Sequence, residues 1–549
     1  MREIRDVEVL MRDGIQLSID VFLPEDAGTP VPALVGMSPY GKDIQSMDIP
    51  PQPPTSPIYA REIEAGDPRH LTANGYAHVI ADVRGIGNSG GTYRGWLSEE
   101  EALDGYDLIE WVADQEWCSG DVGMVGVSYY GAIQLHIAAT KPPHLKAIMP
   151  FNAPADFYRE STYHGGILQT FYHMLYQLKV LGRWSSVTVE SSSEEELEII
   201  KRGLYEDPDI QQYQALYNIA RNPDRNPGFF DIMSHPLDGE FYWSRSPYKH
   251  YRDIEIPAYL GSGWWAYGHQ HLRGAFQNYL GLPGYTKLYI ESRIESPAPM
   301  GEDYNERVVR WYDHWLKGID TGIEDEPPIE IEVRGKGTQF EHEWPLARTE
   351  WKRLYLGRWG ALRDAPESNV VRGDVYVQQP IVYTREVSKR CYETRPLTEE
   401  LDVIGPLAVE LYASIDATDT NWIISVSDVA PDGSATELTR GFLKASHRAL
   451  DEAKSTPWMP FHTHTDPELV EPGAINQYNI QLSPMASRIH RGHKLRLCVA
   501  SLDHKFDPAP DLEIGGPSHM PTHVGIGNTV THELMFGDLH PSHLIIPVV

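Results

Sequence analysis

The sequence predicts an α/β protein with a helical insertion and a C-terminal antiparallel β domain. In the first third of the chain, buried strands alternate with amphipathic helices, a pattern typical of a parallel sheet. From about residue 150 to 235 helical patterns replace the strands, and after about 350 only short strands separated by turns recur. The chain has 549 residues, which is long enough for three or four domains of about 150 residues each.

The first third begins with a hairpin, because 7–9 and 15–22 both alternate apolar and polar residues around the turn Asp13-Gly14. Buried strands are then expected at 31–37, 76–83, 122–127 and 145–149, and helices at 100–115 and from Ser128 onward. Residues 151–240 are interpreted as a helical insertion, which is either a cap that shapes a substrate pocket or a packing element. The sheet resumes at 256–261 and 287–290, followed by a helix at 304–316.

The last 200 residues predict a β-sandwich or jelly roll. Strand patterns bounded by turn residues occur at 403–414, 421–429, 478–482 and 494–500. The predicted domains are 1–150 and 241–345 for the two parts of the α/β domain, 151–240 for the cap and 346–549 for the jelly roll.

The composition limits the partners. The 78 acidic and 47 basic side chains give a net charge of −31, which argues against a nucleic-acid partner. No apolar run approaches the ~18 residues that a membrane span requires. The expected partner is therefore a small-molecule substrate, and the existence of a homo-oligomer stays open. The N-terminus MREIRDVEVLMRDG lacks the apolar core of a signal peptide, which predicts a cytoplasmic protein.

Cysteine and histidine usage predicts neither a disulfide framework nor a metal or cofactor site. Cys118, Cys391 and Cys498 are few, odd in number and far apart, as expected in a reducing compartment. The sequence contains no CxxC or HExxH motif for zinc. His462 and His464 have side chains that bind metals, but their Pro-rich surroundings predict a solvated loop.

One motif contains a candidate catalytic nucleophile. The stretch Gly126-Val-Ser-Tyr-Tyr-Gly131 lies between a predicted strand and a predicted helix, where an α/β-hydrolase places its nucleophile on a sharp turn. Small residues let the backbone bend there and expose the Ser128 hydroxyl at the helix N-terminus. The common pattern has glycine two residues after the serine, whereas Gly131 comes three after. Because Ser128 stands between a strand and a helix, a role as nucleophile is favoured over a role as a simple helix cap.

The residues around this motif resemble the CocE/NonD hydrolases, the group that contains cocaine esterase, X-prolyl dipeptidyl peptidases and α-amino-acid ester hydrolases. The resemblance extends over nearly the whole chain. The matching stretches are Ser38-Pro39-Tyr40, 82–91, 104–111, 117–129, 241–247, Gly263-Trp264-Trp265, 310–321, Gly405-Pro406, 428–433, 491–496 and Pro541-Ser542.

The resemblance implies an α/β-hydrolase domain with an inserted helical cap, a C-terminal jelly roll and hydrolysis of an ester or amide. It also implies roles for individual residues. Ser128 takes the nucleophile position, and an oxyanion hole is formed by the phenol of Tyr40 and the backbone N–H of Tyr129. Donors placed where charge develops are each worth roughly 3 kcal/mol in such reactions.

The chain departs from the family at both supporting members of the catalytic set. A serine hydroxyl needs a base, normally a histidine oriented by a carboxylate. The family's aspartate follows Gly-Trp-Tyr, but here the stretch reads Gly263-Trp264-Trp265-Ala266. No histidine occurs from Leu272 to Asp313, the stretch that contains the next strand, and Glu295 stands at the expected position.

Three explanations compete. A histidine such as His269 or His271 serves as the base; Glu295 itself acts as the base, directly or through water; or hydrolysis has been lost. In the third case the pocket supports elimination, condensation or acyl transfer, or the chain is a catalytically silent binding protein. The fold alone does not choose among these functions.

Overall fold

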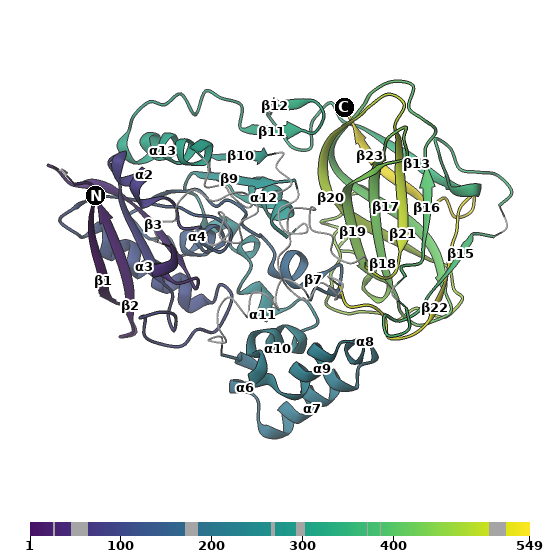
Figure 1. The fold of residues 1–549 in the computed structure, drawn as a ribbon, viewed down its shortest axis with the longest axis horizontal. Helices are drawn as coiled ribbons and strands as arrows, with labels where there is room; N and C mark the ends of the chain where they lie inside the picture. Colours follow the sequence, from purple (N-terminus) through teal and green to yellow (C-terminus); the bar gives the residue numbers. More distant parts are fainter. Residues whose placement is uncertain are drawn as a thin grey trace.

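The computed structural model describes residues 1–25, 28–45, 64–170, 185–264, 270–291, 302–370, 372–384, 386–503 and 523–549. An α/β domain and a β domain lie side by side, and a small group of helices projects from the α/β domain (Figure 1). The predicted fold class, an α/β-hydrolase domain with a helical cap and a C-terminal jelly roll, is confirmed.

The α/β domain contains a sheet in the order β1-β2-β4-β3-β5-β6-β9-β10-β11-β12. Neighbours are parallel from β4 through to β11, while β1, β2 and β12 are antiparallel to their neighbours. The strands are β1 (Arg2–Leu10), β2 (Gln16–Leu23), β3 (Val31–Ser38), β4 (Ala77–Asp82), β5 (Cys118–Met124), β6 (Leu145–Ile148), β9 (Ala258–Gly263), β10 (Thr286–Glu291), β11 (Ile329–Val333) and β12 (Gly337–Glu341).

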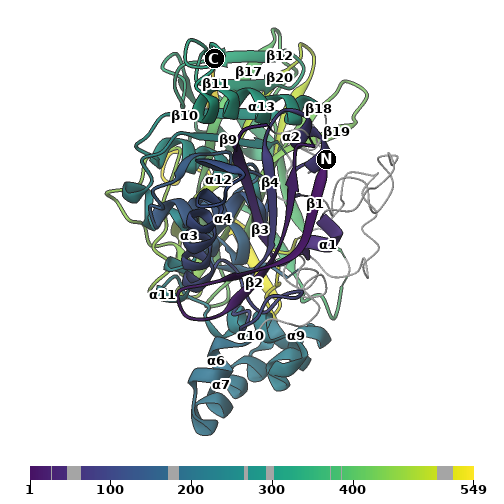
Figure 2. The same cartoon turned by 90° about the vertical axis from the view of Figure 1, so that its left-hand side faces the viewer.

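Helices cover both faces of this sheet (Figure 2). Alternate residues of β3 show why, because Val35 joins the large core on one face while Leu34 joins the aromatic core on the other. The helices are α1 (Lys42–Gln45), α2 (Pro68–Ala73), α3 (Glu99–Ala113), α4 (Tyr129–Ala139), α12 (Gln270–Gly281) and α13 (Glu302–Lys317). Helices α3 and α4 contact each other on the first face, and α2 and α13 contact each other on the second.

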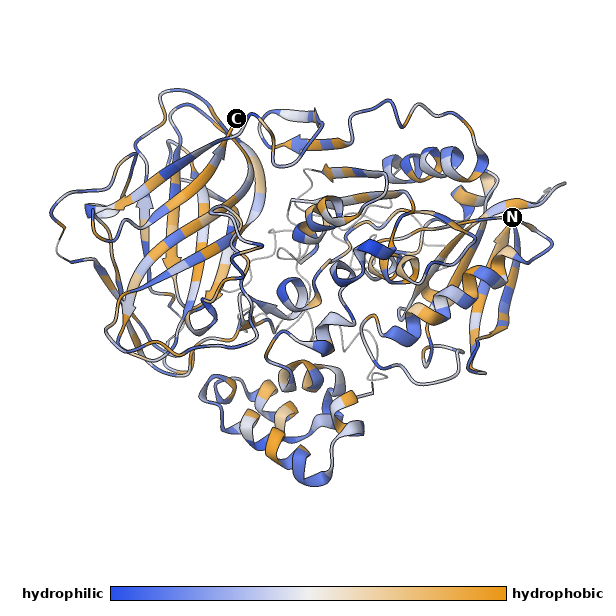
Figure 3. Cartoon of the chain, turned by 180° about the vertical axis from the view of Figure 1, so that it is seen from behind, coloured by the Kyte–Doolittle hydropathy of each residue, from blue (hydrophilic) through white to orange (hydrophobic). Residues whose placement is uncertain are grey.

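The inserted segment is mainly helical. A π-helix (Phe157–Thr162) and a short hairpin of β7 (Tyr163–His164) and β8 (Ile167–Leu168) precede the cap helices. The cap helices are α6 (Val187–Ser191), α7 (Glu194–Glu206), α8 (Pro208–Gln211), α9 (Gln214–Arg221), α10 (Pro227–Ser234) and α11 (Glu240–Trp243). The capping box of Ser193 with Glu196 begins α7, whose polar residues face outward in the hydropathy view (Figure 3).

The C-terminal domain is a β-sandwich of jelly-roll type. Its sheet has the order β15-β22-β17-β20-β19-β18-β21-β16-β14-β13-β23, and a further pairing of β17 with β23 closes it. The strands are β13 (Glu350–Gly357), β14 (Ala361–Arg363), β15 (Asp374–Gln378), β16 (Lys389–Glu393), β17 (Leu401–Ile415), β18 (Asn421–Val429), β19 (Ala435–Lys444), β20 (Asn476–Ile489), β21 (Lys494–Ala500), β22 (Val530–Leu534) and β23 (His543–Val548). Closure leaves few unpaired strand edges.

The β7–β8 turn joins the two domains. Gly165 and Gly166 both have positive φ values, and a Cβ at Gly165 would lie 2.0 Å from the carbonyl oxygen of Phe442. The backbone N–H of Lys444 donates to the carbonyl of Gly165 at 2.8 Å. Only glycine permits so close an approach, so the hairpin is locked against β19.

The expectation of no disulfide is wrong for one pair. Cys391 on β16 lies directly opposite Cys498 on β21, and the two form a disulfide with a Cα–Cα distance of 4.1 Å. Their separation of 107 residues conceals the contact in the sequence, because cross-strand neighbours depend on sheet topology. Cys118 is a free, buried cysteine.

The longest helices are amphipathic or charged. Across the described ranges, none combines the length and apolar character needed to span a bilayer.

Candidate active site

Ser128 lies in the sharp turn that joins β5 to α4. Its backbone has φ 61° and ψ −115°, a conformation that costs a non-glycine residue on the order of 1–3 kcal/mol. Two hydrogen bonds hold this conformation: the Ser128 N–H donates to the carbonyl of Phe151 at 3.0 Å, and the N–H of Ala132 donates to the carbonyl of Ser128 at 2.8 Å. A strained serine between a strand and a helix is the geometry of a hydrolase nucleophile elbow.

Two glycines make this turn possible and explain the unusual spacing of the motif. A Cβ at Gly126, whose φ is 123°, would lie 2.4 Å from the Cβ of Tyr130. A Cβ at Gly131 would lie 2.3 Å from the carbonyl oxygen of Phe151. The first turn of α4 therefore approaches the backbone of Phe151 at Gly131, three residues after the serine, and Gly126 leaves room for Tyr130 at the position that usually holds glycine.

This packing predicts opposite effects for two glycine substitutions. Gly131→Ala is expected to lower the free energy of unfolding by roughly 1–3 kcal/mol, because the new methyl group meets rigid backbone. Gly203→Ala on the exposed face of α7 has no heavy atom nearby, and is expected to raise that free energy by up to about 1 kcal/mol. Thermal unfolding of both variants tests the difference. Equal stability of Gly131→Ala and the wild type would contradict this account of the turn.

Tyr40 lies on the loop after β3, beside the first residues of α4. Its ring centroid is 6.0 Å from that of Tyr129 and 6.3 Å from that of Tyr130. The Oγ of Ser38 accepts the Tyr40 N–H at 3.1 Å. The structure therefore brings together three of the sequence-predicted site residues: Ser128, Tyr129 and Tyr40.

The Gly-rich stretch after β4 positions this loop. The backbone N–H of Lys42 donates to Oδ1 of Asp82 at 2.7 Å, which ties the Tyr40 loop to the end of β4. Burial raises the pKa of Asp82 to about 6. A Cβ at Gly87 would lie 1.9 Å from Oδ2 of Asp82, so this glycine makes room for the carboxylate.

The side chain of Tyr129 is held in a polar cluster under α3. Its phenol oxygen accepts the N–H of Leu97 at 3.1 Å and also bonds to the carboxyl group of Glu101. Glu101 is fully buried, and its other oxygen accepts the N–H of Ser98 at 3.1 Å in the capping box of α3. These hydrogen bonds give the phenol of Tyr129 a structural role. The group that Tyr129 can offer to a reacting carbonyl is its backbone N–H, at the first position of α4.

This cluster predicts a pH-dependent stability. Burial raises the pKa of Glu101 from 4.5 to about 8. Between about pH 5 and about pH 8 the folded state therefore keeps a proton that the unfolded state has already released. The contribution of Glu101 to folding stability therefore declines as the pH rises through that range. Glu101→Gln preserves a neutral hydrogen-bonding group, and is expected to reduce the fall in melting temperature between pH 5 and pH 8. An unchanged fall in the variant would contradict the assignment.

The residues that the sequence predicts as acid and base beside Ser128 follow β9 and β10 in the chain. Ala266, His269 and Glu295 lie outside the described residues. His271 is described, in the first turn of α12, and is fully buried. Burial lowers its pKa to about 3, which makes it a weak base at neutral pH.

Sequence reasoning missed Glu101 and assigned no role to Asp82, although a buried acid opposite a capping serine is a recognisable signal. The expectation that His462 and His464 are solvated is wrong. They are 6% and 3% exposed, because the loop that carries them packs between the two domains, where Nδ1 of His464 lies 3.1 Å from Nδ1 of His447. In the part of the chain that the structure describes, no three His, Cys, Asp or Glu side chains group closely enough to hold a metal ion.

Comparison with protein families matches both domains. Residues 13–292 match the X-Pro dipeptidyl-peptidase (S15 family) domain, and residues 321–542 match the X-Pro dipeptidyl-peptidase C-terminal non-catalytic domain. Together the two matches include most of the α/β domain, the cap and nearly all of the β domain.

Individual relatives align with this chain over nearly its full length. Cocaine esterase from Rhodococcus sp. (strain MB1 Bresler) is 26% identical over 616 aligned positions, which cover 99% of this chain and 98% of that protein. A CocE/NonD family hydrolase from Staphylococcus aureus superposes with a TM-score of 0.79 at 25% identity, covering 100% of this chain and 94% of the other. An α-amino acid ester hydrolase shares the fold, with a TM-score of 0.74 at 19% identity and coverage of 100% and 97%.

Proposed function

Because this chain belongs to the CocE/NonD family of α/β-hydrolases, we propose that it is an acyl hydrolase that cleaves an ester or amide of a small molecule. The observation that carries the proposal is the strained Ser128 at the head of α4, beside Tyr40. The relatives are named for esters and for X-Pro peptides, and both classes of substrate present a carbonyl carbon to a nucleophile.

The proposed reaction follows from this geometry. The Oγ of Ser128 attacks the substrate carbonyl and forms a tetrahedral oxyanion. The phenol of Tyr40 and the backbone N–H of Tyr129 donate hydrogen bonds to that oxygen. Collapse of the intermediate expels the alcohol or amine and leaves an acyl-serine, which water then hydrolyses.

The serine hydroxyl must give its proton to a base as it attacks the carbonyl. Glu295 is our proposed base, acting directly or through water, since it stands where the family has histidine. A free carboxylate is a weak base at neutral pH, so this role requires that its surroundings raise its pKa. His269 is the alternative base, because the burial of His271 and its lowered pKa disfavour that residue.

The test is pre-steady-state hydrolysis of a p-nitrophenyl ester. A burst of nitrophenol equal to the enzyme concentration, followed by slower turnover, is the expected result, because an acyl-serine forms before it is hydrolysed. A burst without turnover, in which added alcohol or amine restores turnover, would instead indicate an acyl transferase. If esters of several different acyl groups give neither a burst nor turnover, acyl hydrolysis is excluded, and elimination, condensation or a binding function becomes the favoured hypothesis.

Tyr40→Phe tests the oxyanion hole separately. Loss of one donor is expected to lower kcat by roughly 10²-fold, with a much smaller change in KM, because the hydrogen bond strengthens only as charge develops. The ring is retained, so the packing against Tyr129 and Tyr130 should survive. An unchanged kcat would remove Tyr40 from the mechanism.

A small molecule is the proposed partner of this site. The cytoplasmic location expected from the sequence stays a prediction. The Cys391–Cys498 disulfide weighs against a reducing compartment.

A further inference from the structure

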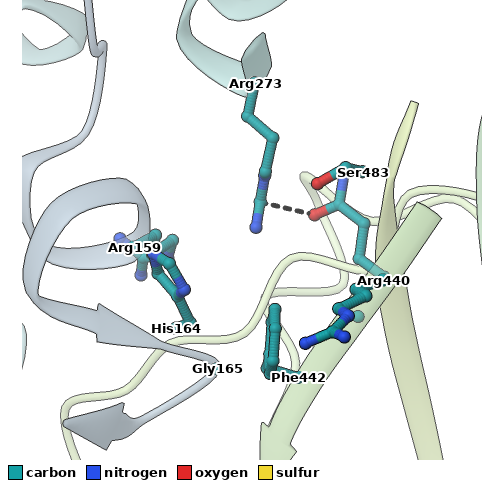
Figure 4. Close-up of a pocket in the computed structure, with 9 residues that line it drawn as sticks. Arg159, His164, Gly165, Arg273, Arg440, Phe442 and Ser483 are labelled. Atoms are coloured by element: carbon teal, nitrogen blue, oxygen red, sulfur yellow. Dashed lines mark hydrogen bonds between the residues drawn. The ribbon is translucent and has the colours of Figure 1, made fainter. Parts of the chain in front are cut away.

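A small pocket lies between the α/β domain and the β domain, and its polar lining is cationic or neutral. Figure 4 shows Arg159 and His164 entering it from the segment after β6, Arg273 from α12, and Arg440 and Ser483 from the β domain. Gly165, Gly441, Phe442 and Gln481 complete the lining. Three guanidinium groups therefore converge on a space whose wall contains no carboxylate among the described residues.

Two of these arginines form ion pairs with carboxylates that do not line the pocket. Arg159 pairs with Asp156 at 2.7 Å and with Asp238 at 2.9 Å. Arg440 pairs with Glu437 and, at 3.0 Å, with Asp503. Arg159 is 5% exposed, and its Nε has no hydrogen-bond partner in the described structure. Each of these two guanidinium groups faces two carboxylates, so its positive charge is fully compensated, but Nε of Arg159 is a buried donor with no partner among the described residues.

Arg273 is different because none of the described carboxylates forms an ion pair with it. Nη2 donates to Oε1 of Gln481 at 2.7 Å, and within the described ranges no carboxylate lies in ion-pair distance of its guanidinium. A partly buried guanidinium normally has a carboxylate or phosphate partner, since an uncompensated buried charge is costly.

The nearest internal candidate, Glu160, does not supply the missing charge. Oε2 of Glu160 accepts the N–H of Ala155 at 2.8 Å, and Oε1 has no partner in the part of the chain that the structure describes. Burial raises the pKa of Glu160 to about 8, although the charge of Arg273 opposes this shift, and among the described contacts no hydrogen bond or ion pair joins the two side chains. The charge of Arg273 is therefore available to a ligand.

We propose that this interdomain pocket binds a small oxyanion, a carboxylate or phosphate group, through the guanidinium of Arg273. The ligand supplies the counter-charge, and donors from both domains contact it, so its binding also tightens the domain interface. A small, monovalent group fits best, because the other two arginines are already neutralised and the pocket is small.

The position of the pocket relates the anion to the proposed catalytic centre. Arg273 lies one turn into α12, the helix that follows the carboxyl end of β9. Ser128 follows the carboxyl end of β5, which is parallel to β9 in the same sheet. Arg273 and Ser128 therefore both follow the carboxyl ends of parallel strands of one sheet, the edge at which ligands of α/β folds bind.

Binding is tested with acetate and inorganic phosphate as probes, on the full chain at constant ionic strength. A saturable rise of the melting temperature with either anion is expected, because a ligand that binds only the folded state stabilises it. Arg273→Gln is expected to weaken this binding by at least roughly tenfold. Arg12→Gln, which removes an exposed arginine paired with Asp107, is the matched control and should bind as the wild type does.

Gln481→Glu provides a second variant that preserves shape and folding. A carboxylate at that position, already in contact with Arg273, is expected to raise the melting temperature without added anion and to abolish the response to anions. If neither anion binds more tightly than about 10 mM, or if Arg273→Gln binds as the wild type does, the proposal is overturned.

The same measurements are made on Ser128→Ala, so failure of the proposed hydrolysis and failure of the anion site are distinguishable. Anion binding that is retained in Ser128→Ala supports the pocket independently of catalysis. In an active protein, competition between acetate and an ester substrate would identify the anion with part of the substrate or product. Non-competitive behaviour would identify a separate small anion, and both outcomes support the site.

Discussion

Replacing Ser128 with alanine is expected to abolish the nitrophenol burst and to lower ester turnover by at least roughly 10²-fold. The substitution removes the only atom that can form the acyl-enzyme in the proposed mechanism. Because Ser128 is almost fully buried and its Oγ makes no hydrogen bond to the described residues, the fold should tolerate the change. The measurement is burst and steady-state kinetics of a p-nitrophenyl ester.

Ser487→Ala is the matched control. Ser487 is also almost fully buried, and its Oγ has no hydrogen-bond partner among the described residues, but it lies on β20 of the β domain. The same chemical change there should leave the burst and the turnover intact. If Ser128→Ala retains wild-type turnover while remaining folded, the hydrolysis does not use this serine.

The second large effect is a gain of activity. The double substitution Ala266→Asp with Glu295→His restores the residue types that the family resemblance implies at these two positions. An oriented histidine base contributes roughly 10²–10⁴-fold to serine-dependent acyl transfer, so ester hydrolysis is expected to rise by about 10²-fold or more. The optimum should move to neutral pH, where a histidine near its ordinary pKa acts as a base.

Two further variants separate the contributions of the pair. Glu295→His alone is expected to give a smaller gain, and Ala266→Asn with Glu295→His tests whether the gain needs a carboxylate and not merely a polar side chain. Both positions lie outside the described residues, so this prediction rests on sequence alignment. No gain in a folded double variant would show that the two loops are aligned incorrectly.

The sequence was sufficient to predict the main architecture, because each element of the α/β domain carries a local signal. Period-2 alternation marked β1 and β2, apolar runs marked the parallel strands, and helical spacing marked α3. The turn between β5 and α4 that carries Ser128 was predicted from the strand and helix patterns on either side of it. The glycine three residues after it was an anomaly in the sequence, and the close approach of Gly131 to Phe151 explains it.

The features that sequence analysis missed are contacts between distant segments. The disulfide joins two strands, and the buried His464 packs against His447 under the domain interface. The convergence of Arg159, Arg273 and Arg440 likewise depends on how the β domain lies against α12. None of these has a local pattern, because each brings together residues that are separated along the chain. Composition gave a misleading indication for the cysteines, since their number and spacing do not reveal cross-strand pairing.

Labelling with a fluorophosphonate probe, followed by mass spectrometry of the modified peptide, tests the central claim most directly. The account predicts one covalent adduct per chain, located on Ser128 and absent from Ser128→Ala, because the strained turn presents a reactive hydroxyl beside oxyanion donors. Folded wild-type protein that stays unlabelled at Ser128, or an adduct at another serine, would contradict it.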